Sequence, residues 1–323
     1  MKAIVCPAYG SPDVLLARDL PAPLPADDEI VVDVSACSVN SADVHLMRGD
    51  SLPLRLVFGL SRPRFSVLGA DVAGTVRAKG AAVTHLSVGD AVVGDLSSHR
   101  MGGFAEQVAA PAKFFVRKPD ALSFVDAAAV PMAGVTAQRA VRDVARVTPG
   151  QRVLVVGAAG GVGSFAIQLA RAIGAEVSAM CHESKHAVPR ALGVIDVWSG
   201  DALDEGALDG RFDVVIDAAA YRWPFAWRRA LAKGGTYVLV GGAFPALVAC
   251  GLLGPLVGPL IGKRFVGMVA LASAEDLESV LALIGEGRVR PLVDRTFSLD
   301  ETSEAVRHVE DRKARGKVVV TVA

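Results

Sequence analysis

The glycine-rich segment at residues 151–163, Gln-Arg-Val-Leu-Val-Val-Gly-Ala-Ala-Gly-Gly-Val-Gly, contains the residue types that point most directly to chemistry. Its apolar run at residues 153–156 predicts a parallel strand buried on both faces, and a helix is expected to follow over residues 164–173. Glycines at this junction let backbone N–H groups approach a pyrophosphate at a helix N-terminus, where the helix dipole favours an anion. The segment therefore predicts a dinucleotide site with the cofactor-binding residues Gly160, Gly161, Val162 and Gly163.

The elements that follow this segment support the interpretation. Ala158 stands where the usual Gly-x-Gly-x-x-Gly fingerprint has its first glycine, so the motif alone is weak evidence. Strand-like runs at residues 175–180, 212–217 and 236–241 alternate with helical stretches, as a doubly wound parallel sheet requires. The alternative is a glycine-rich turn that only packs a helix against a sheet, and these three runs in order disfavour it.

The residues before the glycine segment predict a separate, mostly β domain, because short strand-like runs alternate there with Pro and Gly turns. The runs are residues 29–35, 71–78, 90–93 and 105–109. Beyond the parallel sheet, residues 274–286 predict an amphipathic helix, and Ser298-Leu-Asp-Glu301 is a capping box that begins another helix, to about Lys313. The closing strand at residues 318–322 is expected to return to the first domain.

Length and charge fit an enzyme that acts on a small ligand. The 323 residues are enough for two domains, and 34 Lys and Arg balance 34 Asp and Glu, so no net field attracts nucleic acid or an acidic membrane. The four cysteines (Cys6, Cys37, Cys181 and Cys250) include no pair with C-x-x-C spacing, which argues against a disulfide scaffold or a zinc lobe. We expect a cytoplasmic protein, since no export signal opens the sequence.

Residues 234–262 are uncharged, which raises the question of a membrane span. Pro245, Pro255 and Pro259 would interrupt a spanning helix repeatedly, and residues 236–240 already read as a strand of the sheet. We therefore expect no membrane span. Plain core remains an alternative, and we favour an apolar lid or subunit contact beside the nicotinamide end of the site.

In order along nearly the whole chain, the sequence resembles the medium-chain dehydrogenase/reductase superfamily, in its zinc-independent quinone oxidoreductase branch. Besides the glycine segment, the motifs are Tyr9-Gly-Ser-Pro-Asp-Val-Leu15, Val39-Asn-Ser-Ala-Asp43, Leu68-Gly-Ala-Asp-Val-Ala-Gly-Thr-Val76, Val88-Gly-Asp90, Gly102-Gly-Phe-Ala-Glu106, Gly134-Val-Thr-Ala137, Lys233-Gly-Gly235 and Gly316-Lys-Val-Val319. The resemblance implies an α/β fold, with a Rossmann doubly wound parallel sheet plus a GroES-like mostly β catalytic domain and an active site in the cleft.

The implied domains are a GroES-like part at residues 1–121, a Rossmann domain at residues 122–270, and a return to the catalytic domain at residues 271–323. Homodimers are usual in the family, often through the last Rossmann strand, here residues 264–270. We therefore expect a homodimer.

The resemblance also implies that the protein uses no zinc. Zinc-dependent members place Cys, His and Cys ligands at the positions matched by Asn40, Ala70 and Ala133, and none of these three residues is an ordinary zinc ligand. Without a Lewis acid to polarise an alcohol oxygen, the interconversion of simple alcohols and aldehydes lacks its usual catalytic group. Reduction of conjugated acceptors remains accessible.

The end of the second Rossmann strand favours NADPH over NADH, because Met180 and Cys181 stand where an Asp or Glu would bind the ribose hydroxyls of NAD. In the resemblance Lys185 faces the adenosine phosphate, with hydrogen bonds from His182 and Ser184. Cys181, His182, Ser184 and Lys185 are thus expected to bind the cofactor. Glu183 argues for NADH, and a solvated lysine is the alternative for Lys185.

The resemblance places Asn40 at the floor of the cleft and His45 where related enzymes carry a Tyr or a proton-relay His. Both are candidate catalytic residues; the alternative for His45 is a hydrogen bond to a ribose or a neighbouring loop. Further cofactor contacts are expected from Thr136, from Val240 and Gly241 at a strand end, and from Lys317. A helix-start hydroxyl and a solvated lysine are the alternatives for Thr136 and Lys317.

These features together predict an NADPH-dependent oxidoreductase that transfers hydride to a quinone or an α,β-unsaturated carbonyl acceptor. The substrate would be a small apolar or conjugated carbonyl compound. Two alternatives remain: a zinc-free NADP-linked alcohol dehydrogenase, and a non-catalytic NADPH-binding regulatory protein.

Overall fold

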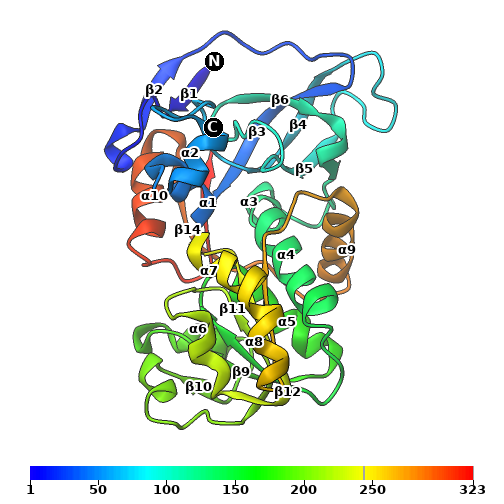
Figure 1. The fold of residues 1–323 in the computed structure, drawn as a ribbon. Coiled ribbons are helices and arrows are strands. Elements are labelled where there is room, and N and C mark those ends of the chain that lie inside the picture. Colours follow the sequence, from blue (N-terminus) through cyan, green and yellow to red (C-terminus); the bar gives the residue numbers. More distant parts are fainter. Residues whose placement is uncertain (243, 323) are drawn as a thin grey trace. The chain divides into compact units, whose positions relative to one another are not determined.

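The computed structural model describes residues 1–242 and 244–322, which divide into two compact units (Figure 1). The first unit comprises residues 1–135, 271–285 and the residues from 291 onward, and the second comprises residues 136–270 and 286–290. The division thus falls at Val135, later than the boundary at residue 121 that the sequence suggested. Helix α3 (Phe124–Ala128) explains the difference, because it packs on strands β3 (Glu29–Val39) and β4 (Asp71–Lys79) of the first unit.

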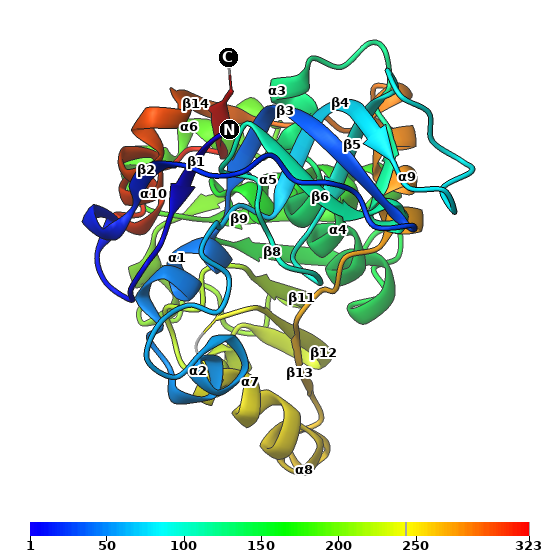
Figure 2. The same cartoon turned by 90° about the horizontal axis from the view of Figure 1, so that it is seen from above.

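The first unit is built on a mainly antiparallel sheet, as the alternating strand-like runs predict. The order of its strands is β14 (Val293–Ser298), β15 (Lys317–Thr321), β3, β4, β5 (Ala91–Asp95) and β7 (Phe115–Arg117), and β6 (Gln107–Pro111) also pairs with β3. β15 pairs antiparallel with β3, Val318 opposite Val39, so the closing strand does return to the first domain. The N-terminus of the chain also lies in this unit (Figure 2).

Short elements complete the first unit. β1 (Lys2–Val5) and β2 (Leu16–Asp19) form a hairpin, and the helices are α1 (Ser41–Arg48), α2 (Leu52–Phe58), α3, α9 (Ala274–Gly285) and α10 (Thr302–Glu310). The expected capping box is present: Ser298 N donates to Glu301 Oε2 at 2.8 Å, in the 3-10 turn that leads into α10.

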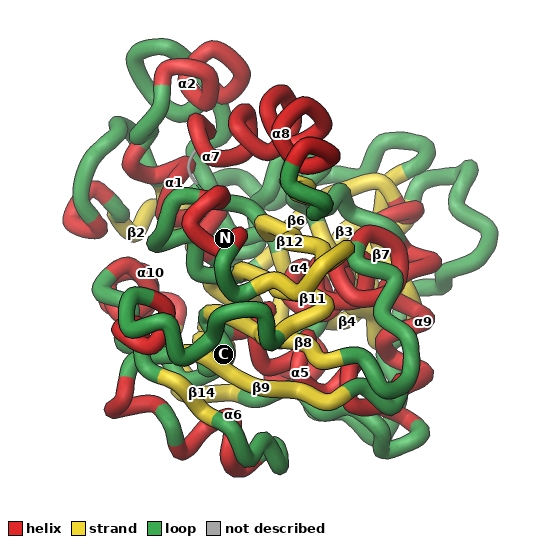
Figure 3. The backbone as a smooth tube through the Cα atoms, turned by 60° about the horizontal axis from the view of Figure 1, so that its bottom comes forward, coloured by secondary structure: helices red, strands yellow, loops and turns green. Residues whose placement is uncertain are grey.

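The second unit contains the doubly wound parallel sheet that the sequence predicts (Figure 3). Its strand order is β10 (Val197–Trp198), β9 (Glu176–Met180), β8 (Arg152–Val156), β11 (Phe212–Asp217), β12 (Leu231–Val240) and β13 (Arg264–Met268), all parallel. The chain runs outward from β8 to β10 and then back to β11. The strand order therefore reverses between β8 and β11, where ligands bind in such sheets.

The uncharged stretch forms three consecutive helical segments after β12. They are α7 (Phe244–Val248), a π-helical turn (Ala249–Leu253) and α8 (Gly254–Leu260), with Pro255 in the first turn of α8 and Pro259 inside it. Ala243, within the stretch, lies outside the described residues. Across residues 1–242 and 244–322, every helix is too short or too polar to traverse a bilayer.

Candidate functional site

The glycine segment joins β8 to helix α5 (Gly161–Ile173) by a tight turn. Gly157 has φ +75°, and a Cβ there would lie 3.1 Å from the carbonyl carbon of Ala218, so Gly157 supplies the turn in place of the missing glycine at Ala158. Gly163 permits close packing of helix on strand, because a Cβ on it would lie only 2.2 Å from Gly157 O. Gly157 thus takes the role that the first glycine of the usual fingerprint would have at the position of Ala158.

The N-terminus of α5 fits an anion. The first N–H groups of a helix have no intrahelical acceptor, and the N-cap residue Gly160 offers no side chain to accept from them. The N–H groups of Gly161, Val162 and Gly163 are therefore oriented as a pyrophosphate requires, at the positive end of the helix dipole. These residues would hold the diphosphate of a dinucleotide.

The predicted adenosine-side residues lie next to this loop. Gly157 N and Ala158 N donate to the carbonyl oxygen of Met180 at 3.0 and 3.2 Å, which ties the loop to the end of β9. The next residues form one 3-10 turn, in which His182 Nδ1 lies 3.0 Å from Ser184 Oγ. The four predicted ligands, Cys181, His182, Ser184 and Lys185, are thus brought together, and Glu183 is exposed in the same turn.

The other predicted cofactor residues of the second unit lie at two places. Val240 ends β12, and Gly241 follows it and donates from its N to Met268 O at 3.0 Å. Thr136 is buried in α4 (Pro131–Gln138), the helix in which the two units divide. Their contact with a nicotinamide stays a prediction.

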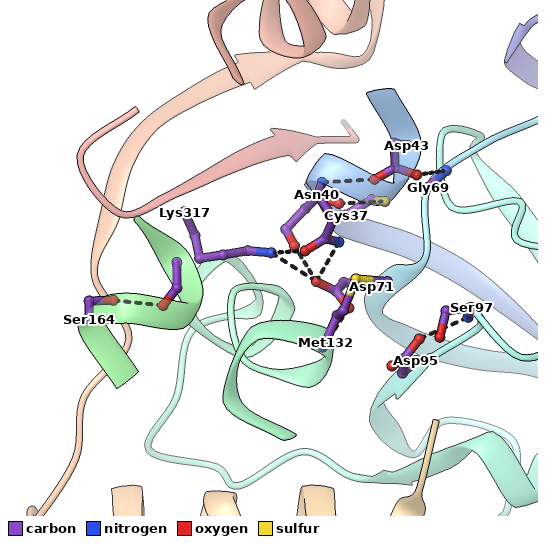
Figure 4. Close-up of polar contacts among 12 residues, drawn as sticks. Cys37, Asn40, Asp43, Gly69, Asp71, Asp95, Ser97, Met132, Ser164 and Lys317 are labelled. Carbon is purple, nitrogen blue, oxygen red and sulfur yellow. Dashed lines mark hydrogen bonds and ion pairs between the residues drawn. The ribbon is translucent and has the colours of Figure 1, made fainter. Parts of the chain in front are cut away.

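The first unit contains a buried polar cluster of Ser38, Asn40, Asp71 and Lys317. Figure 4 shows Asn40, Asp71 and Lys317 pointing toward one another. Strand register brings it together, since β3 lies between β4 and β15 and Ser38 is paired with both Asp71 and Val319. Asp71 Oδ2 accepts from Ser38 Oγ at 2.5 Å, from Asn40 Nδ2 at 3.0 Å and from Lys317 Nζ at 3.1 Å. Lys317 Nζ also donates to Asn40 Oδ1, at 2.5 Å.

The cluster holds the Asn40 side chain through both its amide nitrogen and its amide oxygen. Lys317 and Asp71 are 4% and 0% exposed, so they form a buried ion pair that water screens little. The alternative of a solvated Lys317 is therefore wrong. Asn40 keeps one Nδ2–H that the cluster does not use, because an amide nitrogen has two donors and Asp71 accepts only one.

Sequence reasoning missed Asp71. Asp71 lies inside the motif at residues 68–76, and Met132 N donates to its second oxygen, Oδ1, at 2.9 Å. The available signal was a carboxylate at the start of an apolar strand, a residue type that is buried only when it is paired.

Two further carboxylates lie buried near the cluster. Asp43 accepts from Asn40 N at 2.8 Å and from Gly69 N at 2.9 Å, and burial raises its pKa to about 7 although these hydrogen bonds oppose the shift. Burial and the charge of Asp71 also raise the pKa of Asp95. Asp43 closes the first turn of α1, so we assign it a structural role.

His45 is not part of the cluster. Its side chain on α1 is 47% exposed, and Nδ1 lies 2.6 Å from Asp50 Oδ2, just beyond the helix. This contact matches the alternative of a hydrogen bond to a neighbouring loop. A catalytic role for His45 stays a prediction.

The residues at the positions matched to zinc ligands do not fit a metal. Ala70 and Ala133 are buried and have no donor atoms, and Asn40 is engaged by Lys317 and Asp71. In the part of the chain that the structure describes, no three His, Cys, Asp or Glu residues are grouped to hold an ion.

Two family models match the sequence. The model described as alcohol dehydrogenase GroES-like domain matches residues 26–120, and the model described as zinc-binding dehydrogenase matches residues 191–320. The first match confirms the GroES-like assignment of the mostly β unit.

Curated relatives extend over the whole chain. The mitochondrial NAD(P)H oxidoreductase RTN4IP1 of Mus musculus is 31% identical over 359 residues, which include 100% of this chain and 89% of that protein. The NAD-dependent alcohol dehydrogenase of Sulfurisphaera tokodaii is 31% identical over 355 residues, 99% of each chain. The polyketide synthase GfsB of Streptomyces halstedii is 35% identical over 302 residues, 92% of this chain, but this chain spans only 5% of its length.

Solved structures have the same fold. The quinone oxidoreductase from Coxiella burnetii superposes with a TM-score of 0.89 at 30% sequence identity and covers 100% of this chain and 99% of its own. The fold described above is therefore also present in an oxidoreductase of known structure.

Proposed function

The chain belongs to the medium-chain dehydrogenase/reductase superfamily, and we propose that it is a zinc-independent, NADPH-dependent reductase of quinones or α,β-unsaturated carbonyl compounds. The observation that carries the proposal is that the Asn40 amide is hydrogen-bonded to both Asp71 and Lys317. Where zinc-dependent relatives are expected to hold a metal ligand, this chain has an amide fixed by a buried Lys317–Asp71 pair. Such a group can donate a hydrogen bond but cannot serve as an ordinary zinc ligand.

In the proposed reaction, one group of residues binds the dinucleotide and another stabilises the negative charge that develops on the acceptor. The glycine loop and α5 hold the diphosphate of the dinucleotide, whose reduced nicotinamide supplies a hydride when it is bound. Addition of hydride to an enone or quinone places negative charge on the carbonyl oxygen. A proton from solvent, taken at the α carbon of the enolate or at the oxygen of the quinol, completes the reduced product. We propose that the free Nδ2–H of Asn40 donates to the carbonyl oxygen. The positive charge of Lys317 polarises the Asn40 amide in the direction that favours donation.

The first test is turnover. The purified protein is expected to oxidise NADPH with small quinones or enones, and to keep this activity after exhaustive chelation because the described residues offer no metal ligands at the matched positions. Oxidation of an alcohol panel with NADP that survives chelation would instead indicate the zinc-free alcohol dehydrogenase. A chelator-sensitive rate would contradict zinc independence. Tight NADPH binding without turnover of any acceptor would leave the non-catalytic alternative.

The same assay assigns the two proposed catalytic residues. Asn40→Ala is expected to lower kcat by about 10²-fold with little change in NADPH affinity, as for the loss of one donor to a developing oxyanion. His45→Ala should lower kcat only if the imidazole donates the proton, and His85→Ala, at an exposed histidine of the same unit, is the matched control. Equal rates for the His45 and His85 variants would assign His45 to its contact with Asp50.

We propose a preference for NADPH over NADH of at least tenfold. The loss of the ribose-binding acid and the presence of Lys185 motivate it, since tenfold is about 1.4 kcal/mol and one charge-assisted phosphate contact exceeds that. Titration of both cofactors against the wild type and Lys185→Ala measures it, with Lys233→Ala at an exposed lysine of the same unit as control. Equal affinities in the wild type would assign the decisive role to Glu183.

We further propose that the protein is a homodimer through β13 and the helices before it. β13 is the last strand of its sheet, so among the described residues one of its edges has no strand partner. Beside it, an apolar hollow of about 520 Å³ is lined by residues including Phe244, Leu247, Met268 and Val269. Exposed leucines on α8, such as Leu256, extend this surface, which suits a subunit contact or the wall of an acceptor site.

A further inference from the structure

We infer that Tyr221 is the platform on which the adenine of the dinucleotide stacks. The inference rests on the proposed cofactor binding and adds a residue that neither the glycine motif nor the phosphate-side turn includes. It is based on the position of the Tyr221 side chain across the carboxyl edge of the sheet, the edge formed by the C-terminal ends of the parallel strands.

Tyr221 follows β11, but its hydroxyl donates to Met180 Sδ at 2.8 Å, at the end of β9. Because β8 lies between β9 and β11, the side chain must pass over the end of β8, where the glycine loop begins. A Cβ on Gly200, just beyond β10, would lie 3.7 Å from the same hydroxyl. The ring therefore lies over the half of the carboxyl edge that contains Cys181 and Lys185.

The ring is held in place and remains accessible. Trp227 meets it edge-to-face, with ring centroids 6.3 Å apart, and Met180 anchors the hydroxyl. Burial raises the pKa of Tyr221 to about 12, so the hydroxyl stays a donor at neutral pH. Nevertheless 39% of the residue is exposed. A flat, oriented and partly open aromatic surface is what a purine base requires, and stacking of this kind is insensitive to the identity of the base.

The neighbouring charge argues for the base rather than for a phosphate. Arg222 lies over the ring, with its Cζ 5.9 Å from the ring centroid, but its guanidinium is paired with Asp204, with Nη1 2.9 Å from Oδ1. A neutralised guanidinium adds little for an anion. Tyr221 should therefore contribute equally to NADPH and NADH, whereas Lys185 should distinguish them.

The test is calorimetric titration of ADP, 2′,5′-ADP, NADPH and nicotinamide mononucleotide into the wild type and Tyr221 variants. Tyr221→Ala and Tyr221→Leu are expected to weaken the three adenine-containing ligands by about tenfold and by similar factors. Nicotinamide mononucleotide, which has no adenine, should bind unchanged. Tyr221→Phe keeps the ring and should remain within about twofold of the wild type. The leucine variant keeps apolar bulk against Trp227, in case the alanine variant unfolds.

Trp223→Ala is the matched control, since Trp223 is an exposed aromatic residue in the same loop. The inference is overturned if the adenine ligands bind equally to the wild type and Tyr221→Leu, or if Trp223→Ala causes the loss instead. A wild type that binds none of the adenine ligands would overturn the proposed cofactor itself, and the inference with it. Weaker binding of 2′,5′-ADP and NADPH with unchanged binding of ADP would overturn the inference and assign Tyr221 to the 2′-phosphate.

Discussion

Gly163→Ala is expected to weaken dinucleotide binding by more than tenfold, and Gly163→Val to abolish it. The Cβ of either variant would lie 2.2 Å from Gly157 O and 2.8 Å from the Cα of Ala158. Both are backbone atoms, which cannot rotate away as a flexible side chain can. The helix α5 must therefore move away from β8, and its first N–H groups move with it away from the diphosphate position.

Gly285→Ala provides the matched control, because a Cβ there meets nothing within 4 Å. Fluorescence titration of NADPH against both variants gives the affinities, and circular dichroism shows whether the fold persists. A Gly163→Ala protein that is folded and binds NADPH like the wild type would mean that the diphosphate does not rest on α5. The proposed reductase would then lack its cofactor site.

The glycine loop was predictable because its signal is local. An apolar run ending in glycines gives strand, turn and helix from neighbouring residues alone, and the structure has β8, the turn and α5 in those places. Even the departure at Ala158 was visible in the sequence. Its compensation by Gly157 was not, because a positive φ at one glycine among several is set by the packing around it.

The buried cluster was not predictable for the opposite reason. Asp71 and Lys317 are separated by 246 residues, and only the pairing of β3 with both β4 and β15 brings them together. Lysine side chains are mostly exposed, so the sequence alone leaves solvation open for Lys317. His45 shows the converse case: its residue type suggests catalysis, and its contact with Asp50 is visible only in the structure.

The boundary between the two units also depends on contacts between residues that are distant in the sequence. Sequence patterns change character near residue 121, where strand-like runs give way to helices. The contacts continue further, because α3 packs on β3 and β4, and Met132 N donates to Asp71. Local patterns thus find the change from strand to helix, but the surface on which a helix packs decides the unit to which it belongs.

Asp71→Asn is expected to destabilise the protein by about 3–5 kcal/mol, the usual cost of leaving one partner of a buried ion pair alone. The change nearly keeps the shape of the side chain, removes the negative charge that Lys317 faces at 3.1 Å, and replaces one of the two acceptor oxygens by an NH2 group. Urea unfolding at neutral pH measures the loss. Asp33→Asn is the matched control, because Asp33 forms an exposed pair with Arg77 at 3.4 Å, and such pairs contribute about 0–1 kcal/mol.

A double-mutant cycle separates the pair from its surroundings. Lys317→Met alone leaves Asp71 buried with hydrogen bonds but no cation, whereas Asp71→Asn with Lys317→Met removes both charges. The double variant should therefore lose less stability than the sum of the two single variants. Additive losses, or an Asp71→Asn cost no larger than that of Asp33→Asn, would mean that Lys317 is not a buried cation. Asn40 would then lack the positive charge that the proposed reduction needs behind its amide.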